Sequence, residues 1–202
     1  CLYGVPGTGK SAYAKFIAKS LKKPIIIKKG SDLLSMYLGE TEKNIALSFK
    51  EAKDQHAVLV FDEVDSFLQD RGMATRSWEI TQVNEMLVQM ESFEGIFIAT
   101  TNLIDNLDKA CLRRFDLKLE FGYLLPEQAQ NLFKKECALL KVKFDENVVK
   151  KVSNLGLLAP GDFASVRRQA KFRPIKNGDD FCHRLELEVA LKNEEKSAKI
   201  GF

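Results

Sequence analysis

The sequence predicts an α/β fold, with a parallel sheet flanked by helices and a small helical domain after it. Short, continuously apolar runs alternate with longer amphipathic stretches as far as residue 122, which is the pattern of strands buried on both faces. From Tyr123 onward the strand-like runs stop and helical patterns take over. We therefore expect an α/β domain at residues 1–122 and a helical domain at residues 123–202.

The individual elements follow from these patterns. Pro126 suits the first position of a helix, and Asp162 follows Pro160-Gly161 as an expected N-cap. The expected strands are residues 1–3, 24–27, 57–61, 96–100 and 117–121. The expected helices are residues 12–21, 79–90, 127–140, 146–153, 162–171 and 180–193.

Composition excludes several classes of protein. The 202 residues carry 31 basic and 28 acidic side chains without a dense basic run, so charge does not predict nucleic-acid binding. The four cysteines lie far apart and form no C-x-x-C pair, which argues against zinc or a disulfide framework and favours the reducing cytoplasm. There is no signal-peptide pattern, and no apolar run approaches the roughly 18 residues of a membrane span.

A glycine-rich motif, Gly4 to Ser11, carries the first chemical signal. It satisfies G-x-x-x-x-G-K-[ST], follows an apolar strand and leads into a helical pattern, as a P-loop requires. Backbone N–H groups and the helix N-terminus would surround phosphates, Lys10 would reach the β and γ phosphates of ATP, and Ser11 would bind Mg²⁺. The residues expected to contact the nucleotide are Gly4, Val5, Pro6, Gly7, Thr8, Gly9, Lys10, Ser11 and Ala12.

Two carboxylates end a second apolar strand, in the sequence Val58-Leu59-Val60-Phe61-Asp62-Glu63. The carboxyl ends of parallel strands meet at the ligand-binding edge of a sheet, so this is a Walker B pattern. Successive strand residues point to opposite sides, so we expect Asp62 to face the metal and Glu63 to face the attacking water.

Together these motifs resemble an ATPase module of the AAA family within the AAA+ superfamily, including its katanin and spastin branch and its bacterial membrane-bound proteases. The resemblance implies that Asn102, at the end of Thr100-Thr101-Asn102, is the sensor that helps align the water. It implies that Arg113 and Arg114, within Leu112 to Asp116, are arginine fingers that enter a neighbouring subunit's site in a ring, expected to be a hexamer.

The same resemblance assigns a substrate-contacting segment. In Ser35 to Glu42, Tyr37 and Leu38 with the following glycine match the first pore loop, which touches a translocating polypeptide, and Asp70 to Trp78 occupies the place of the second. Glu91-Ser92-Phe93 retains one residue, Phe93, of an Asp-Gly-Phe signalling motif.

In the helical domain the resemblance makes Gly161 a backbone contact to the nucleotide. Arg167 and Arg168 are left open between nucleotide contact and a solvated helix face. Related modules also carry a segment before the P-loop that closes over adenine, so the resemblance implies that the amino-terminal part of the module is absent. We expect hexamerisation without that segment to be weak.

The leading interpretation is an ATPase that pulls a polypeptide through the pore of a ring, with ATP and Mg²⁺ as cofactors. A nucleotide-gated assembly scaffold is an alternative, although Glu63 argues against it because a scaffold needs no activated water. A small-molecule kinase would not explain Asn102 or the two arginines, and a DNA-directed motor is disfavoured by the weak charge.

Overall fold

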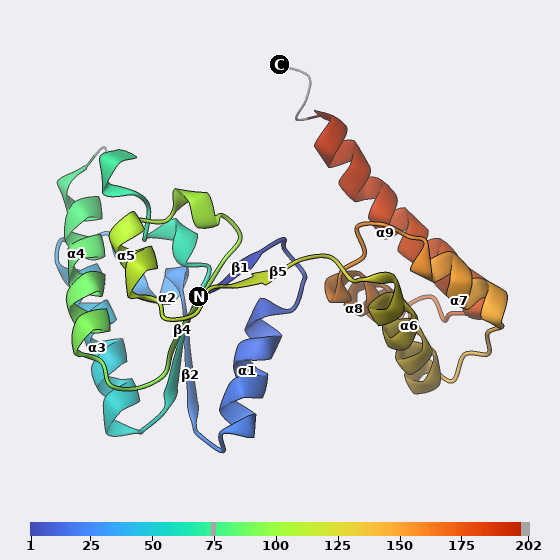
Figure 1. The fold of residues 1–202 in the computed structure, drawn as a ribbon, viewed down its shortest axis with the longest axis horizontal. Helices are drawn as coiled ribbons and strands as arrows, with labels where there is room; N and C mark the ends of the chain where they lie inside the picture. Colours follow the sequence, from blue (N-terminus) through green and yellow to red (C-terminus); the bar gives the residue numbers. More distant parts are fainter. Residues whose placement is uncertain (74–75, 199–202) are drawn as a thin grey trace. The chain divides into compact units, whose positions relative to one another are not determined.

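The chain folds into two compact units. The computed structural model describes residues 1–73 and 76–198 (Figure 1). The first unit contains Cys1–Gly4 and Lys10–Phe121, and the second contains Val5–Gly9 and the described residues from Gly122 onward. Each unit has its own apolar core, so each is described by itself.

A parallel sheet forms the centre of the first unit. Within the described residues it has five strands in the order β2-β3-β4-β1-β5, and every pairing between neighbours is parallel. The predicted α/β class is therefore confirmed. The strands are β1 (Leu2–Gly4), β2 (Ile25–Lys29), β3 (Val58–Asp62), β4 (Phe97–Thr101) and β5 (Leu119–Phe121).

Helices cover both faces of this sheet. Figure 1 shows α3 (Glu40–Asp54) and α4 (Ser77–Ser92) side by side against one face, and α1 (Lys10–Ser20) against the other. Alternation along β3 explains this arrangement, because Leu59 and Phe61 join the cluster that contains α3 and α4 residues, whereas Val58 and Val60 join the cluster that contains α1 residues. The strand is thus apolar at successive positions because both of its faces are buried.

Shorter elements complete the first unit. Helix α2 (Gly30–Leu33) follows β2, and α5 (Lys109–Arg114) precedes β5. Three 3-10 turns lie at Val64–Ser66, Arg71–Met73 and Ile104–Asn106. Helix α5 begins because the side chain of Asp108 accepts hydrogen bonds from the N–H groups of Ala110 and Cys111, which makes Asp108 its N-cap.

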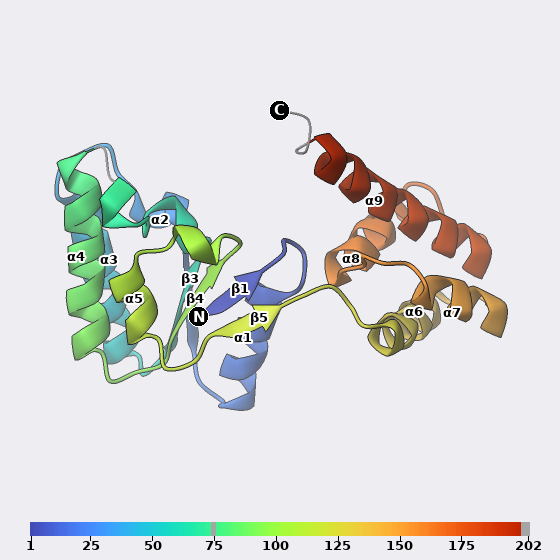
Figure 2. The same ribbon diagram turned by 45° about the horizontal axis from the view of Figure 1, so that its top comes forward.

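Four helices pack together in the second unit, within the part of the chain that the structure describes. Figure 2 shows them from a second angle: α6 (Pro126–Leu140), α7 (Glu146–Ser153), α8 (Pro160–Gln169) and α9 (Gly178–Ala198). The aromatic rings of Phe133, Phe163 and Phe181 meet in their core, with centroids 5.2 to 6.1 Å apart. Pro126 opens α6 as predicted.

The predicted N-cap of α8 is wrong. The helix begins at Pro160, and Ala159 occupies the N-cap position in extended backbone. Asp162 is the third helical residue. Its carboxylate accepts a hydrogen bond from the N–H of Ala159 (2.7 Å) and forms an ion pair with Lys192 (2.6 Å). Pro160 begins the helix because its fixed φ suits the first helical position. Asp162 then caps the helix from the third position, where its buried carboxylate accepts the N–H of Ala159.

The four cysteines are buried and carry free thiols. Burial, reinforced by the charge of Asp108, raises the pKa of the Cys111 thiol to about 12. No helix among the described residues has the length and apolar character needed to span a membrane.

Phe61 should be a main source of stability in the first unit, because its ring is fully buried and contacts Phe49, Phe67 and Phe97. We expect Phe61→Ala to lower the free energy of unfolding by about 3–5 kcal/mol through lost contacts and a cavity. Chemical denaturation followed by the fluorescence of Trp78, the one tryptophan of the sequence, measures this. The control Phe16→Ala removes a ring that is 61% exposed and should cost less than about 1 kcal/mol; equal losses in both variants would contradict the prediction.

Candidate functional site

The register of the sheet brings polar residues together at the carboxyl ends of three strands. Tyr3 pairs with Thr101, so the start of the P-loop is level with Asn102. Phe61 pairs with Ala99, so Asp62 is level with Thr100. Residues that are 40 to 100 positions apart in sequence thus share one edge, which is the edge where parallel sheets bind ligands.

The carboxylate of Asp62 accepts two hydroxyl groups. Ser11 donates its Oγ hydrogen to Asp62 Oδ1 over 2.7 Å, and the hydroxyl of Thr100 donates to the same oxygen. The two residues predicted to bind the metal are therefore in direct contact. Sequence reasoning missed Thr100, since its importance depends on strand register, which no local pattern contains.

Glu63 takes a backbone conformation that we did not predict. We expected it to continue the strand and point away from Asp62 by simple alternation, but β3 ends at Asp62. Glu63 has φ 61° and ψ 52°, the left-handed region that is unfavourable for a residue with a side chain. Its N–H donates to Thr100 Oγ1 (3.1 Å) and its side chain is exposed, so the turn, and not strand alternation, sets the direction of this carboxylate.

Lys10 lies at the centre of the polar cluster and is 7% exposed. Its ammonium donates to the carbonyl oxygen of Gly4 (2.8 Å) and to Oδ1 of Asn102 (2.7 Å). Burial lowers the pKa of Lys10, and the negative charges of Asp62, Asp65 and Glu63 act in the opposite direction. The structure thus brings the P-loop lysine and the predicted sensor asparagine into contact.

Asp65 is a second residue that sequence reasoning missed. Its Oδ1 accepts the hydroxyl of Thr101 over 2.9 Å and the N–H of Asn102 over 3.4 Å. It therefore holds the end of β4 and orients the backbone from which Asn102 projects. A third carboxylate after Asp62-Glu63 was the available signal, but the sequence did not reveal that it faces β4.

The middle of the P-loop, Val5–Gly9, belongs to the second unit and contacts α8 there. Gly4, Gly7 and Gly9 have φ values of 123°, 77° and 99°, which other residues rarely adopt. The N–H of Gly161 donates to the carbonyl oxygen of Gly7 over 2.8 Å, and the hydroxyl of Thr8 donates to the carbonyl oxygen of Val5 over 2.7 Å. The N–H of Gly161, which we expect from the sequence to contact the nucleotide, is therefore bonded to the P-loop itself. Pro6 and Ala12 are exposed.

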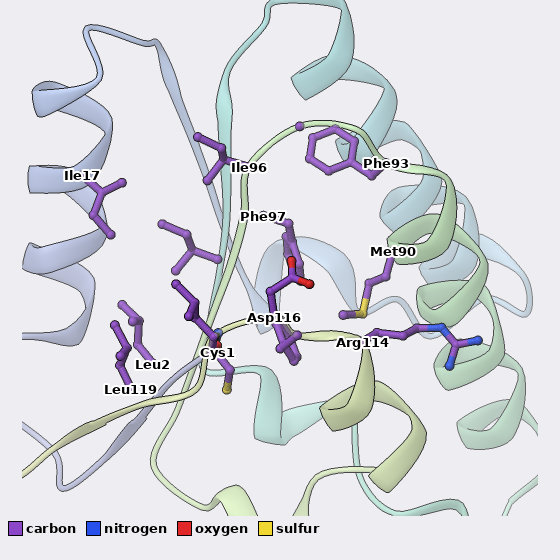
Figure 3. Close-up of a pocket in the computed structure, with 14 residues that line it drawn as sticks. Cys1, Leu2, Ile17, Met90, Phe93, Ile96, Phe97, Arg114, Asp116 and Leu119 are labelled. Atoms are coloured by element: carbon purple, nitrogen blue, oxygen red, sulfur yellow. Dashed lines mark hydrogen bonds between the residues drawn. The ribbon is translucent and has the colours of Figure 1, made fainter.

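Arg113 and Arg114 lie at the end of α5, apart from the Lys10–Asn102 pair. Arg114 forms an ion pair with Glu91 (3.3 Å) and lines a cavity of about 330 Å³ at the amino ends of β1, β4 and β5, which is the opposite edge of the sheet from the polar cluster. Figure 3 shows Arg114 on the Met90 side of this cavity, with Leu2 and Leu119 on the other side. Arg113 is exposed.

Tyr37 and Leu38 lie in the loop between α2 and α3 and are 67% and 84% exposed. Ser35 shapes this loop, because its Oγ donates to Glu40 (2.6 Å) and accepts the N–H of Tyr37 (3.2 Å). This loop lines one side of a groove, and Trp78 also lines it. The guanidinium of Arg76 lies over the ring of Trp78. Residues 74 and 75 of the expected second pore loop lie outside the described residues.

The two ambiguous arginines of α8 differ in their surroundings. Arg167 forms an ion pair with the buried carboxylate of Glu136 over 2.9 Å, and Arg168 is exposed. Arg167 therefore links α8 to α6 in this structure.

The parallel sheet, its strand order and the P-loop between β1 and α1 define a P-loop nucleotide-binding module. Residues 1–123 match the model of the ATPase family associated with various cellular activities (AAA), which is more than half of the chain. The chain therefore belongs to the AAA family, as the sequence motifs predicted.

Individual relatives cover most of this chain. It is 36% identical to the peroxisomal ATPase PEX6 of Candida glabrata over 99% of its length, and 35% identical to a proteasome-associated ATPase of Kribbella flavida over 66%. It is 28% identical to the ATP-dependent zinc metalloprotease FtsH of Clostridium perfringens over 98%. The matches cover 21%, 27% and 30% of these three relatives.

Gly161 should be sensitive to substitution, because a Cβ there would lie 3.0 Å from both the Cα and the carbonyl oxygen of Gly7. We expect Gly161→Ala to displace the P-loop backbone and to weaken ATP binding severalfold, as measured by titration with a fluorescent ATP analogue. Gly156→Ala is the matched control, because a Cβ at Gly156 meets no atom within 4 Å. Unchanged affinity in Gly161→Ala would show that the Gly7–Gly161 contact does not shape the loop.

Proposed function

We propose that this chain binds ATP with Mg²⁺ and hydrolyses the γ-phosphate as one subunit of a ring. The observation that carries the proposal is the contact of two P-loop residues, Lys10 and Ser11, with Asn102 and Asp62 at the ends of two other strands. A phosphate cradle, a metal ligand and a polar side chain suited to orienting water then share one sheet edge. Membership of the AAA family supports the same conclusion.

The P-loop residues would bind the phosphates. Positive φ values at Gly4, Gly7 and Gly9 allow the loop to curve, and α1 begins at Lys10 so that its N-terminus faces the same space. The ammonium of Lys10 would exchange the oxygens of Gly4 and Asn102 for phosphate oxygens. Lys10 is almost completely buried, so its ammonium has little contact with water. A negatively charged phosphate would therefore be a more favourable partner for it than the neutral oxygens of Gly4 and Asn102.

Ser11 and Asp62 are suitable ligands for Mg²⁺. Both present oxygen atoms, their oxygens are already 2.7 Å apart, and Mg²⁺ commonly takes one or two protein ligands together with phosphate oxygens and water. A bound Mg²⁺ ion would neutralise phosphate charge.

Glu63 and Asn102 would act on the attacking water. The exposed carboxylate of Glu63 can accept the water's proton, and its position is held by the bond from its own N–H to Thr100. Asn102, oriented by Asp65, can hydrogen-bond to the same water once Lys10 turns to phosphate. Because a positioned general base contributes about 10²–10⁴-fold to rate, Glu63 is the residue on which turnover should depend most directly.

Arg113 and Arg114 would serve a neighbouring subunit. Arg114 lies at the opposite edge of the sheet from Lys10, so it is poorly placed to reach phosphates bound in its own subunit. Both side chains are exposed on a short helix, where an adjacent molecule could be reached. This arrangement supports a ring, which we expect to be a hexamer, in which each active site combines residues of two subunits.

A polypeptide is the substrate that we propose for the ring. Met36, Tyr37 and Leu38 form a continuous exposed apolar run, with 90%, 67% and 84% of their surfaces accessible. Large apolar side chains at a loop tip are costly to leave in water and are typical of a contact surface. The names of two relatives, a proteasome-associated ATPase and an ATP-dependent metalloprotease, support a polypeptide as the molecule acted upon.

Loss of the Glu63 carboxylate should separate binding from turnover. In the full-length assembled protein we expect Glu63→Gln to reduce ATP turnover by about 10²-fold or more, because the amide cannot accept the proton of the attacking water, while ATP binding is retained. Phosphate release and nucleotide titration measure the two quantities. The control Glu94→Gln changes an exposed carboxylate on the same unit and should turn over normally. Normal hydrolysis by Glu63→Gln would rule out the proposed mechanism.

Removal of the Tyr37 ring should separate turnover from work on the substrate. We expect Tyr37→Ala to keep its ATPase rate but to lose most unfolding of a fluorescent protein that carries an unstructured tail. Phe172→Ala, which removes an aromatic ring that is 91% exposed in the second unit, should leave both activities intact. If Tyr37→Ala unfolds the substrate at the normal rate, the pore assignment of Tyr37 is wrong while the ATPase assignment stands.

A further inference from the structure

The helix that carries Arg113 and Arg114 depends on its neighbours for its position. Helix α5 has six residues, which is too short to be stable by itself, so the groups that hold its ends decide where the arginines point. At its first end, Oδ1 of Asp108 accepts the N–H groups of Ala110 (2.9 Å) and Cys111 (3.2 Å). The first turn of the helix is therefore held by one carboxylate, in addition to the packing of Cys111 and Phe115 in the core.

That carboxylate is fixed in turn by Arg71. The Nε of Arg71 donates to Asp108 Oδ2 over 2.8 Å, and the Nη1 of Arg71 donates to Oδ1 of Asn84, on α4, over 3.0 Å. Asp108 is 3% exposed. Burial by itself would raise the pKa of Asp108, but hydrogen bonds from Arg71 and from the backbone of Cys111 and Ala110 outweigh it and lower the pKa. The Asp108 carboxylate is therefore charged at neutral pH and buried, whereas the Arg71 side chain is partly exposed.

Backbone pairing joins the segment of Arg71 to the segment of Asp108. The N–H of Asp108 donates to the carbonyl oxygen of Leu68 and the N–H of Asp70 donates to that of Asn106, each over 3.0 Å. Gln69 and Leu107 form an antiparallel bridge between these two bonds. The stretch that follows Glu63 and the stretch that precedes α5 are thus joined by backbone hydrogen bonds.

At the other end of α5, Phe115 is buried in the core, but the side chain of Arg114 is held less firmly. Arg114 pairs with Glu91 over 3.3 Å, and the Glu91 side chain is 73% exposed. Exposed ion pairs contribute little, about 0–1 kcal/mol, whereas a pair with a buried member is less screened by water. The guanidinium of Arg114 can therefore leave Glu91 for another partner while Asp108 keeps the helix in place.

We propose that Asp108 and Arg71 are positioning residues, and that the ion pair between the buried Asp108 carboxylate and Arg71 helps to set the direction in which α5 presents Arg113 and Arg114 to the adjacent subunit. The inference rests on the proposed role of these arginines as fingers. It adds that the chain after Glu63 and the finger helix are mechanically joined, so that each subunit's own Walker B segment helps to place the arginines that serve its neighbour.

Subunit mixing in the full-length assembled protein tests this inference. Asp108→Asn keeps an oxygen that can cap α5 but removes the charge that holds Arg71. We expect Asp108→Asn rings to lose at least about tenfold in turnover, because a misplacement of roughly 1 Å can cost about 10²-fold. The defect should be in kcat, with the KM for ATP nearly unchanged, because the variant's own phosphate site is intact.

Addition of Glu63→Gln subunits should then restore activity. Such subunits cannot hydrolyse ATP but have intact fingers, so a one-to-one mixture should recover up to about a quarter of normal turnover, the share of interfaces that pair an intact site with an intact finger. Arg71→Lys should behave in the same way as Asp108→Asn, because one ammonium cannot reproduce the fork that reaches both Asp108 and Asn84. Lys109→Ala is the control, because Lys109 is on the same helix but outside the Arg71–Asp108 pair. Its ATP turnover should be normal without added Glu63→Gln subunits.

Two outcomes distinguish the possible failures. The double variant Arg113→Ala, Arg114→Ala mixed with Glu63→Gln is the reference for finger loss; if it does not recover, the finger assignment is wrong and the inference falls with it. If the reference recovers and neither Asp108→Asn nor Arg71→Lys does, although circular dichroism shows both folded, the pair stabilises the subunit's own site and the inference alone is overturned.

Discussion

The parallel pairing of β1, β3 and β4 is the constraint on which the rest of the candidate site depends. Their register puts Gly4 level with Asn102 and Asp62 level with Thr100, so that loops distant in sequence end at one edge. The apolar side chains of Val58 to Phe61 support this pairing, since they are buried on both faces of β3, which lies between β2 and β4. The polar groups then appear where the strand ends.

This edge combines two features that are unfavourable for folding alone. Lys10 is a buried charge and Glu63 has a left-handed backbone, whereas Asp62 is well satisfied by two hydroxyl donors on one oxygen. Buried charges and strained backbone of this kind are typical of functional sites. The hydrogen bonds of Thr100 and Asp65 hold the arrangement in place and explain why two residues outside the recognised motifs belong to it.

Helix α5 illustrates a second level of organisation. Its arginines are exposed, but the Asp108 carboxylate at its start is buried and paired. A helix with a buried anchor and exposed charged side chains would suit the proposed action on another subunit, because the anchor limits the directions in which those side chains point. The proposed ring would use this arrangement at every interface.

Local patterns were sufficient for much of this protein. Continuous apolar runs predicted all five strands of the sheet in the described residues to within two residues at either end, and P-loop and Walker B motifs identified the AAA family before any fold was known. These features depend on side-chain polarity and on glycine spacing, which are properties of a short stretch of chain. They can therefore be recognised in the sequence without knowledge of the tertiary structure.

Tertiary structure alone decided the rest. Thr100 and Asp65 acquire partners only through strand register, the N–H of Glu63 bonds to Thr100 on another strand, and the carboxylate of Asp162 pairs with Lys192 on α9. Asp108 and Arg71 are 37 positions apart and look like ordinary surface charges in the sequence. A contact between distant residues has no local signature, since its energy depends on geometry that exists only after the chain has folded.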